Sequence, residues 1–186
     1  MTTLPPSISN WFETRGWSLH PHQIDMLTRA QDPSLLLIAP TGGGKTLAGF
    51  LPTLAELADG THQGLHTLYV SPLKALAADI KRNLRRPVED IGLPIRIEDR
   101  TGDTSYTQKR RQRADPPHIL LTTPESLALL LSYEDAPRIF RGLQRVVVDE
   151  LHALADSKRG DQLMLSLSRL QAFMCQVDWR HILRLF

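Results

Sequence analysis

A glycine-rich segment offers the most specific chemistry in the sequence. Residues 39–46 read Ala-Pro-Thr-Gly-Gly-Gly-Lys-Thr and follow an apolar run, with Ala39 standing where the general pattern has its first glycine. In such a loop, successive backbone N–H groups can curl around phosphate oxygens, and a helix N-terminus adds a favourable dipole. Lys45 would reach the outer phosphates, and the Thr46 hydroxyl would bind Mg²⁺. The residues expected to hold a nucleotide are Thr41, Gly42, Gly43, Gly44, Lys45 and Thr46. The alternative is a glycine-rich turn without a ligand.

Two adjacent carboxylates, Asp149 and Glu150, follow the apolar run Arg145–Val148. Neighbouring residues on a strand point in opposite directions. At a strand end, Asp149 could hold Mg²⁺ through water while Glu150 turns toward an attacking water, which is what hydrolysis of a phosphoanhydride requires. The alternative is a solvated strand terminus. The glycine-rich loop favours the first interpretation, because both halves of a Mg-nucleotide site are then present.

These residues need a scaffold, and the apolar pattern indicates one. Short runs rich in Leu, Ile and Val predict strands at Leu35–Ala39, Thr67–Val70, Ile95–Ile97, His118–Thr122 and Arg145–Val148. Helical spacing separates them at Lys45–Ala58, Lys74–Arg86, Ser105–Arg113, Pro124–Ser132 and Gly160–Phe173. The alternation predicts an α/β fold with a doubly wound parallel sheet and helices on both faces. In such sheets ligands bind beyond the carboxyl ends of the strands.

Composition sets the limits of this interpretation. The chain has 186 residues, 41% hydrophobic and 23% charged, with a formal net charge of +2, which fits one globular domain and gives no general sign of a nucleic-acid binder. Cys175 is the only cysteine, which excludes an internal disulfide. The N-terminal segment does not read as a signal peptide, and we find no apolar stretch long enough to span a bilayer. We therefore expect a cytoplasmic protein.

The motifs together resemble those of a known family. Gly42-Gly43-Gly44-Lys45-Thr46 and Asp149-Glu150-Leu151-His152 look like motifs I and II of a superfamily 2 DExH-box helicase. Ser71-Pro72-Leu73-Lys74-Ala75-Leu76 resembles motif Ia, Arg100-Thr101-Gly102-Asp103-Thr104 a family loop, and Thr122-Thr123-Pro124-Glu125-Ser126-Leu127 motif Ib. These variants, with the later Ser157-Lys158-Arg159-Gly160, look like the Lhr group, in particular the ligase-associated helicases of DNA repair. The resemblance implies a RecA-like domain that uses ATP and Mg²⁺.

The resemblance also implies roles for individual residues. Catalytic roles fall to Lys45, Asp149, Glu150 and the coupling residue His152, with Thr46 and Asp149 holding the metal. Gln23 occupies the place of the family's adenine-reading glutamine, and Trp17 or Phe12 would stack on the base unless they belong to the core. The nucleic-acid track would comprise Ser71, Lys74, Arg100, Thr101, Gly102, Thr123 and Pro124. Ser71-Pro72 and Thr123-Pro124 also read as plain helix starts. Asp103 and Glu125 should repel phosphate, so we expect them to shape loops.

The resemblance has limits at the end of the chain. Helicases of this family need a second RecA-like domain, which supplies a catalytic arginine, and the pattern is lost over residues 172–186. We therefore expect a helicase ATP-binding domain over residues 1–171 followed by an atypical tail, in which 181–186 could fill the next strand position. The expected function is that of the first motor domain of an ATP-dependent DNA-repair helicase, which binds Mg-ATP and single-stranded DNA or RNA and does not unwind duplexes alone. DNA ligase and nuclease partners are implied by the resemblance only. The alternatives are a phosphotransferase that uses the same loop and an inert remnant.

Overall fold

A computed structural model describes residues 4–39, 42–174 and 181–185. The helices are α1 (Pro6–Thr14), α2 (Pro21–Thr28), α3 (Lys45–Leu57), α4 (Lys74–Ile91), α5 (Tyr106–Ala114), α6 (Pro124–Leu131), α7 (Ala136–Ile139), α8 (Leu151–Leu154) and α9 (Lys158–Met174). The strands are β1 (Ser34–Leu37), β2 (Thr67–Val70), β3 (Ile97–Arg100), β4 (Ile119–Thr122), β5 (Arg145–Val148) and β6 (His181–Leu185).

The strands form one parallel sheet in the order β1-β6-β5-β2-β4-β3. Val70, at the end of β2, lies opposite Val148 of β5 and Thr122 of β4. The segments that follow these three strands therefore leave the sheet at one edge. The α/β class with a doubly wound parallel sheet is confirmed, and the carboxyl edge is where motifs Ia, Ib and II begin.

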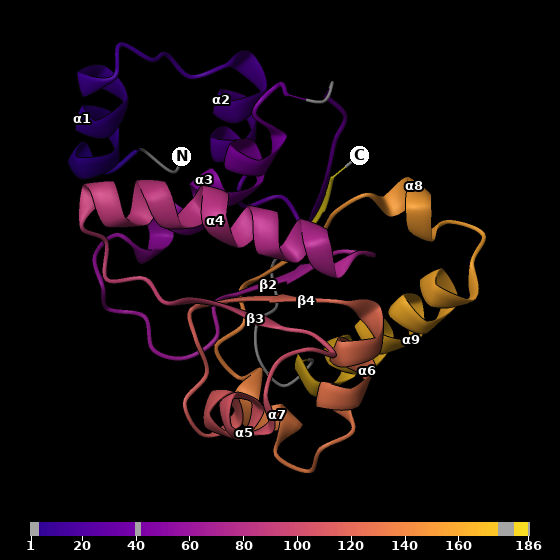
Figure 1. Cartoon of the computed structure of the whole chain (residues 1–186). Coiled ribbons are helices and arrows are strands. Elements are labelled where there is room, and N and C mark those ends of the chain that lie inside the picture. Colours follow the sequence, from indigo (N-terminus) through magenta and orange to yellow (C-terminus); the bar gives the residue numbers. More distant parts are fainter. Residues whose placement is uncertain (1–3, 40–41, 175–180, 186) are drawn as a thin grey trace.

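Helices cover both faces of the sheet (Figure 1). On one face, α1 to α4 bury a core that includes Trp11, Phe50, Leu54, Tyr69 and Leu84. On the other face, α6, α7 and α9 pack over a second core, which includes Leu68, Leu127, Val146 and Leu163. The β2 and β5 strands are buried throughout, because they contribute alternate side chains to the two cores. No helix within the described residues is long and apolar enough to cross a membrane.

Some predicted boundaries were wrong. The third strand runs from Ile97 to Arg100, whereas the sequence predicted Ile95–Ile97. It is an edge strand, and its charged residues Glu98 and Asp99 interrupt the apolar pattern on which the prediction was based. The helix predicted to end at Arg86 continues through Pro87 to Ile91 and stops at Gly92, which has φ 73°. Glycine takes up this left-handed conformation without strain.

The predicted boundary at residue 171 stays a prediction. Helix α9 continues past it to Met174, and residues 181–185 lie in the sheet as β6, between β1 and β5. This is the strand position that the sequence suggested for the end of the chain. Residues 175–180 and Phe186 lie outside the part that the structure describes.

Candidate functional site

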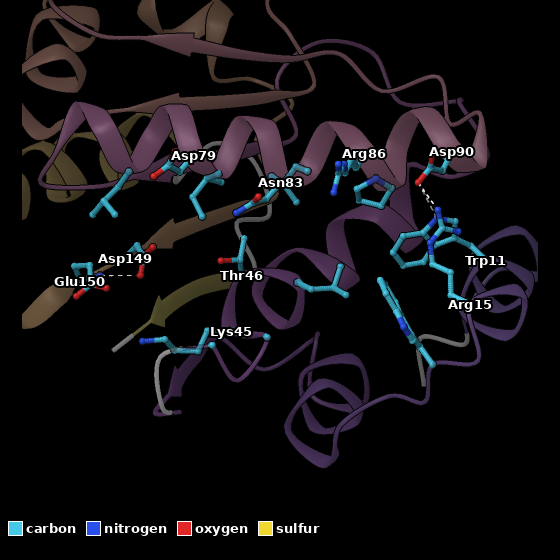
Figure 2. A pocket seen from close by; sticks show the side chains of 18 residues that line it. Trp11, Arg15, Lys45, Thr46, Asp79, Asn83, Arg86, Asp90, Asp149 and Glu150 are labelled. Carbon is cyan, nitrogen blue, oxygen red and sulfur yellow. Dashed lines mark hydrogen bonds and ion pairs between the residues drawn. The ribbon is translucent and has the colours of Figure 1, made fainter.

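A cavity of about 780 Å³ lies at the carboxyl edge of the sheet, between α3, α4 and α1 (Figure 2). Its lining includes the two predicted halves of the Mg-nucleotide site, namely Gly42, Gly44, Lys45, Thr46, Asp149 and Glu150. Lys45 and Thr46 are separated from Asp149 and Glu150 by about a hundred residues in sequence. The fold brings them to one cavity, as the motifs predicted.

Backbone conformation explains the glycines of the loop. Gly42 and Gly44 have φ values of 82° and 75°, which side-chain-bearing residues rarely adopt. A Cβ atom on Gly44 would also come within 2.9 Å of Gln23 Nε2. Helix α3 begins at Lys45, and among the described residues no side chain caps its first turn. Backbone N–H groups are thus available for an anion. Thr41 lies outside the described residues.

Asp149 makes three hydrogen bonds, two of which are accepted by its carboxylate. Its backbone N–H donates to the carbonyl oxygen of Val70 (2.9 Å), which extends the β2–β5 ladder by one residue. Its Oδ1 accepts from the Glu150 N–H (2.9 Å), and its Oδ2 accepts from the Tyr69 hydroxyl (2.5 Å). The carboxylate is largely buried but reaches the cavity. Its orientation is therefore set before any ligand binds.

Glu150 has an unusual backbone conformation. Its φ of 51° is in the left-handed region, although it carries a side chain. Such strain is retained where the surrounding structure imposes it, often at functional sites. His152, in α8, places Nε2 3.3 Å from Glu150 Oε2. The predicted water-orienting carboxylate and the predicted coupling histidine are therefore in contact.

The donor set fits Mg²⁺. Thr46 supplies a hydroxyl and Asp149 a carboxylate, and both line the same cavity. Mg²⁺ prefers hard oxygen ligands, keeps several waters, and is commonly bound by one or two protein groups together with substrate phosphates. Within the described residues there is no group of three or more His, Cys, Asp or Glu side chains that could hold a metal by itself. The residues present suit an ion that arrives with a nucleotide.

The predicted base-binding residues take different positions. Gln23 is only 3% exposed, and its Oε1 accepts from the backbone N–H of His20 (2.9 Å) in a capping box at the start of α2. Its amide nitrogen lies beside Gly44, and its contact with adenine stays a prediction. Phe12 belongs to the core. Trp17 is 55% exposed and lines the far end of the cavity beside Arg15.

The predicted nucleic-acid residues gather after β2, β3 and β4, but most of them are buried. Lys74 and Gly102 are exposed, whereas Ser71, Thr101, Thr123 and Pro124 are not. Thr123 accepts from the Ser126 N–H and caps α6, with Pro124 in the first turn, so the helix-start interpretation is right there. It is wrong for Ser71, because α4 begins only at Lys74 and the Ser71 hydroxyl bonds to Leu73 instead.

Arg100 requires a correction. We predicted a phosphate contact, but the side chain is 2% exposed and lies beneath α5. Its Nη1 donates to the Lys109 carbonyl oxygen (2.9 Å) and to Gln112 Oε1 (3.3 Å). Burial lowers the pKa of Arg100 from its ordinary value. In this structure the guanidinium group anchors α5 instead of pointing to solvent.

Asp103 and Glu125 form ion pairs, as expected of residues that shape loops. Asp103 Oδ1 accepts from Lys74 Nζ (2.7 Å), which joins the loop after β3 to the start of α4. Glu125 pairs with Arg159, the arginine of the Ser-Lys-Arg-Gly segment. Gly160, which follows, has no room for a side chain, because a Cβ atom would come within 2.1 Å of the Leu154 carbonyl oxygen.

The family model for DEAD/DEAH box helicases matches residues 20–183. The chain belongs to this family. The Lhr helicase/probable uracil glycosylase of Mycolicibacterium smegmatis is 45% identical over 178 residues, covering 88% of this chain and 12% of the relative. The ATP-dependent helicase Lhr-Core of Methanocaldococcus jannaschii is 39% identical over 183 residues, covering 90% of this chain and 22% of the relative. The chain thus spans less than a quarter of these two relatives.

Solved helicase structures have the same fold. The structure of Mycobacterium smegmatis Lhr bound to ssDNA and AMP-PNP matches 98% of this chain and 24% of its own, with a TM-score of 0.85 and 42% identity. The structure of the DUF1998 helicase MrfA bound to DNA matches 98% of this chain and 26% of its own, with a TM-score of 0.86 and 28% identity. The chain is therefore a RecA-like helicase domain of the Lhr type.

Sequence reasoning missed Tyr69 and did not identify the partners of Arg159. Tyr69 lies inside an apolar strand, where it reads as a core residue, and its hydroxyl reaches Asp149 only because β2 and β5 are neighbours. Burial, followed by the Asp149 charge, raises the pKa of Tyr69, so the hydroxyl keeps its proton and remains a donor. Arg159 was noted in the sequence, but its partners Glu125 and Pro72 lie far away along the chain.

Proposed function

We propose that this chain is the first motor domain of an Lhr-like, ATP-dependent DNA helicase, and that it binds Mg-ATP and single-stranded nucleic acid. The observation that carries the proposal is the shared cavity, into which the glycine-rich loop brings Lys45 and Thr46 and the end of β5 brings Asp149 and Glu150. The activity of a whole helicase is part of the proposal, since the chain spans 12% to 22% of the relatives named above.

Each residue has a separate part in the proposed mechanism. The backbone N–H groups after Gly44 and the Lys45 ammonium group bind and orient the phosphates. Thr46 and Asp149 hold Mg²⁺, which when bound neutralises charge on the outer phosphates. Glu150 orients a water and accepts its proton, and His152 holds the Glu150 side chain from the α8 side. The buried position of Asp149 keeps this arrangement partly shielded from solvent.

The nucleic-acid half of the proposal is carried by fewer residues than the sequence suggested. Lys74 and Gly102 offer the exposed contacts, and the loops after β2, β3 and β4 supply backbone groups around them. Contacts of this kind grip the phosphate backbone without reading bases, as a motor that moves along any sequence requires. DNA is proposed above RNA because of the Lhr resemblance, and the role in repair with ligase or nuclease partners is an extension of the same resemblance.

The two alternative functions, a phosphotransferase and an inert remnant, would give different experimental results. A phosphotransferase would pass the γ-phosphoryl group to a small acceptor without any dependence on nucleic acid. An inert remnant would not bind a nucleotide. The match of residues 20–183 to the DEAD/DEAH box helicase family supports the motor domain over both.

Calorimetric titration with Mg-ATP tests the proposal. Lys45 is the only lysine that lines the described cavity, so Lys45→Ala should abolish measurable binding. Lys158→Ala changes another lysine away from the cavity and should bind as the wild type does. A dissociation constant for Lys45→Ala equal to that of the wild type would contradict the assignment of the phosphate loop, and no binding by the wild type would favour the inert remnant.

A further inference from the structure

We propose that Tyr69 is a positioning residue for the divalent cation: its hydroxyl holds the Asp149 carboxylate in the orientation that receives Mg²⁺. The inference rests on the proposed function, because it concerns the same Mg-nucleotide site. It adds a residue that belongs to none of the motifs discussed above and that lies in the middle of the sheet.

The hydroxyl of Tyr69 needs a partner, and it donates to Asp149, with the Ser71 side chain also beside it. The Tyr69 side chain is completely buried, in a strand where its neighbours Leu68 and Val70 are aliphatic. A buried hydroxyl without a hydrogen bond is costly, so a purely space-filling role would favour phenylalanine or leucine at this position. Here the hydroxyl donates to Asp149 Oδ2 at 2.5 Å. The one polar atom of the side chain therefore ends on the carboxylate assigned to the metal.

This hydrogen bond leaves the carboxylate able to bind a cation. Oδ1 accepts one hydrogen bond from the Glu150 N–H, and Oδ2 accepts one from Tyr69. An ionised carboxylate has about four lone-pair sites, so each oxygen keeps a further position for the waters of an ion. Two fixed hydrogen bonds define the plane of the carboxylate, whereas a single one would allow it to turn about the Cβ–Cγ bond.

Tyr69 also joins the two halves of the site. Its ring packs on that of Phe50, with centroids 5.7 Å apart. Phe50 lies in α3, the helix that begins with Lys45 and Thr46. The same side chain thus contacts the helix that carries the Thr46 hydroxyl and the strand end that carries Asp149.

Residues that orient metal ligands without touching the metal commonly change metal affinity by about 10- to 100-fold when they are mutated. Tyr69→Phe removes only the hydroxyl and leaves the ring on Phe50. We expect the concentration of Mg²⁺ needed for tight ATP binding to rise by about tenfold. Binding of ATP in excess EDTA should not change, because the loop and Lys45 are intact.

The experiment is a calorimetric titration of the 186-residue chain with ATP, in EDTA and across a series of MgCl₂ concentrations. The variants are Tyr69→Phe and Tyr106→Phe, the latter making the same chemical change on the exposed face of α5. Direct binding of Mn²⁺ with ATP, followed by the electron paramagnetic resonance of the metal, gives a second readout that is independent of turnover. Thermal unfolding without ligand shows how far each variant is destabilised.

The outcomes separate the possible roles. A rise in the Mg²⁺ requirement for Tyr69→Phe alone, with a changed Mn²⁺ spectrum, supports the inference. A lower unfolding temperature with an unchanged Mg²⁺ requirement would show a structural role only and would overturn it. In an Asp149→Asn background, Tyr69→Phe should have no further effect on the Mg²⁺ requirement, since it acts through Asp149. If ATP binding by the wild type does not respond to Mg²⁺, the proposed metal site is wrong and this inference fails with it. If the wild type requires Mg²⁺ and Tyr69→Phe has the same Mg²⁺ requirement, this inference alone is overturned.

Discussion

The guanidinium group of Arg159 holds the carboxylate of Glu125 with two hydrogen bonds, from Nε (2.5 Å) and from Nη2 (3.2 Å). The same Nη2 donates to the Pro72 carbonyl oxygen at 2.5 Å. Arg159 lies at the start of α9, a few residues after the Asp149-Glu150 pair, while Pro72 and Glu125 belong to the segments that follow β2 and β4. One side chain thus joins the segment after the proposed catalytic carboxylates to both loops of the proposed nucleic-acid face.

Arg159→Ala should weaken binding of a single-stranded oligonucleotide while leaving Mg-ATP affinity unchanged. The pair is partly exposed, and exposed ion pairs contribute up to about 1 kcal/mol, so we expect a two- to fivefold loss, roughly. Fluorescence anisotropy with a labelled oligonucleotide measures it. Arg141→Ala, at an exposed arginine after α7, is the matched control. The double variant Arg159→Glu with Glu125→Arg should recover part of the affinity for the oligonucleotide. If Arg159→Ala binds the oligonucleotide as tightly as the wild type does, Arg159 does not have this role.

Lys74 should contribute to the salt dependence of single-strand binding, and Arg100 should not. Lys74 is exposed and pairs with the exposed Asp103, whereas Arg100 is buried beneath α5. Loss of one phosphate contact to a single strand lowers the slope of log affinity against log salt by about 0.7. Lys74→Gln should show this change, and Asp103→Asn should raise affinity, because it removes a negative charge beside the track.

The measurement is a set of binding isotherms between low and moderate salt. Arg141→Gln controls for the general loss of one positive charge. A slope for Lys74→Gln equal to that of the wild type would exclude Lys74 from the track. A lowered slope for an Arg100→Gln variant that is folded would mean that the arginine leaves its buried position when nucleic acid binds.

The structure brings the residues predicted for nucleotide binding into one cavity, whereas most of those predicted for nucleic-acid binding are buried. Phosphate binding depends on backbone geometry and on a few residues next to strand ends, so Gly44, Lys45 and Asp149 could be placed from local pattern. The position of Arg100 depends on how α5 packs across the sheet edge, and local sequence does not carry that information. An arginine after an apolar run reads as exposed, but here the Lys109 carbonyl and Gln112 provide it with buried acceptors.

The strands of the sheet also differ in how clearly the local sequence marks them. The β2 and β5 strands are buried on both faces and were found with their boundaries correct, because continuous apolar runs mark such strands. The edge strand β3 begins two residues and ends three residues later than predicted, since its charged side chains pair with groups on α4 and α5 and interrupt the apolar pattern. The hydrogen bond from Tyr69 to Asp149 required knowing that β2 and β5 are neighbours.

Acid should destabilise the protein through Glu56, which lies with Arg145 near the amino ends of the strands. Arg145 donates to both Glu56 oxygens, at 2.8 and 3.0 Å, and His66 Nε2 lies 3.3 Å from Glu56 Oε2. Burial raises the pKa of Glu56, but the hydrogen bonds from His66 and Arg145 and the charge of Arg145 outweigh it and bring the pKa to about 2. Because the folded-state pKa is depressed, this stabilisation is complete above about pH 4.5 and disappears as the pH falls toward 2.

Urea unfolding of the wild type and Glu56→Gln between pH 3 and pH 7 checks this prediction. A depression from 4.5 to about 2 corresponds to roughly 3 kcal/mol at neutral pH, so the variant should be less stable there by an amount that shrinks on acidification. Glu134→Gln, at an exposed glutamate, controls for the loss of a carboxylate. Parallel stability curves for wild type and Glu56→Gln would contradict the assignment.

The 186-residue chain should bind Mg-ATP and hydrolyse it slowly, although it contains Lys45, Thr46, Asp149 and Glu150. The charge that develops on the transferring phosphoryl group also needs a cation beside the reacting atoms. The two arginines that line the cavity, Arg15 and Arg86, lie toward α1, away from Asp149 and Glu150 (Figure 2). Loss of a catalytic arginine lowers turnover by about 10³- to 10⁵-fold, or roughly 4 to 7 kcal/mol of transition-state stabilisation.

A steady-state ATPase assay with and without single-stranded DNA measures this. Fusing a second RecA-like helicase domain to the chain should give DNA-stimulated turnover, because the family resemblance assigns a catalytic arginine to that domain. In the fusion, Glu150→Gln should remove turnover while leaving Mg-ATP binding intact, since the amide cannot take the proton of the attacking water. Glu134→Gln in the same fusion should behave as the unmodified protein. Fast DNA-stimulated hydrolysis by the 186-residue chain alone would mean that a cation of this domain, with Arg86 the first to examine, reaches the phosphoryl group after a rearrangement of the cavity.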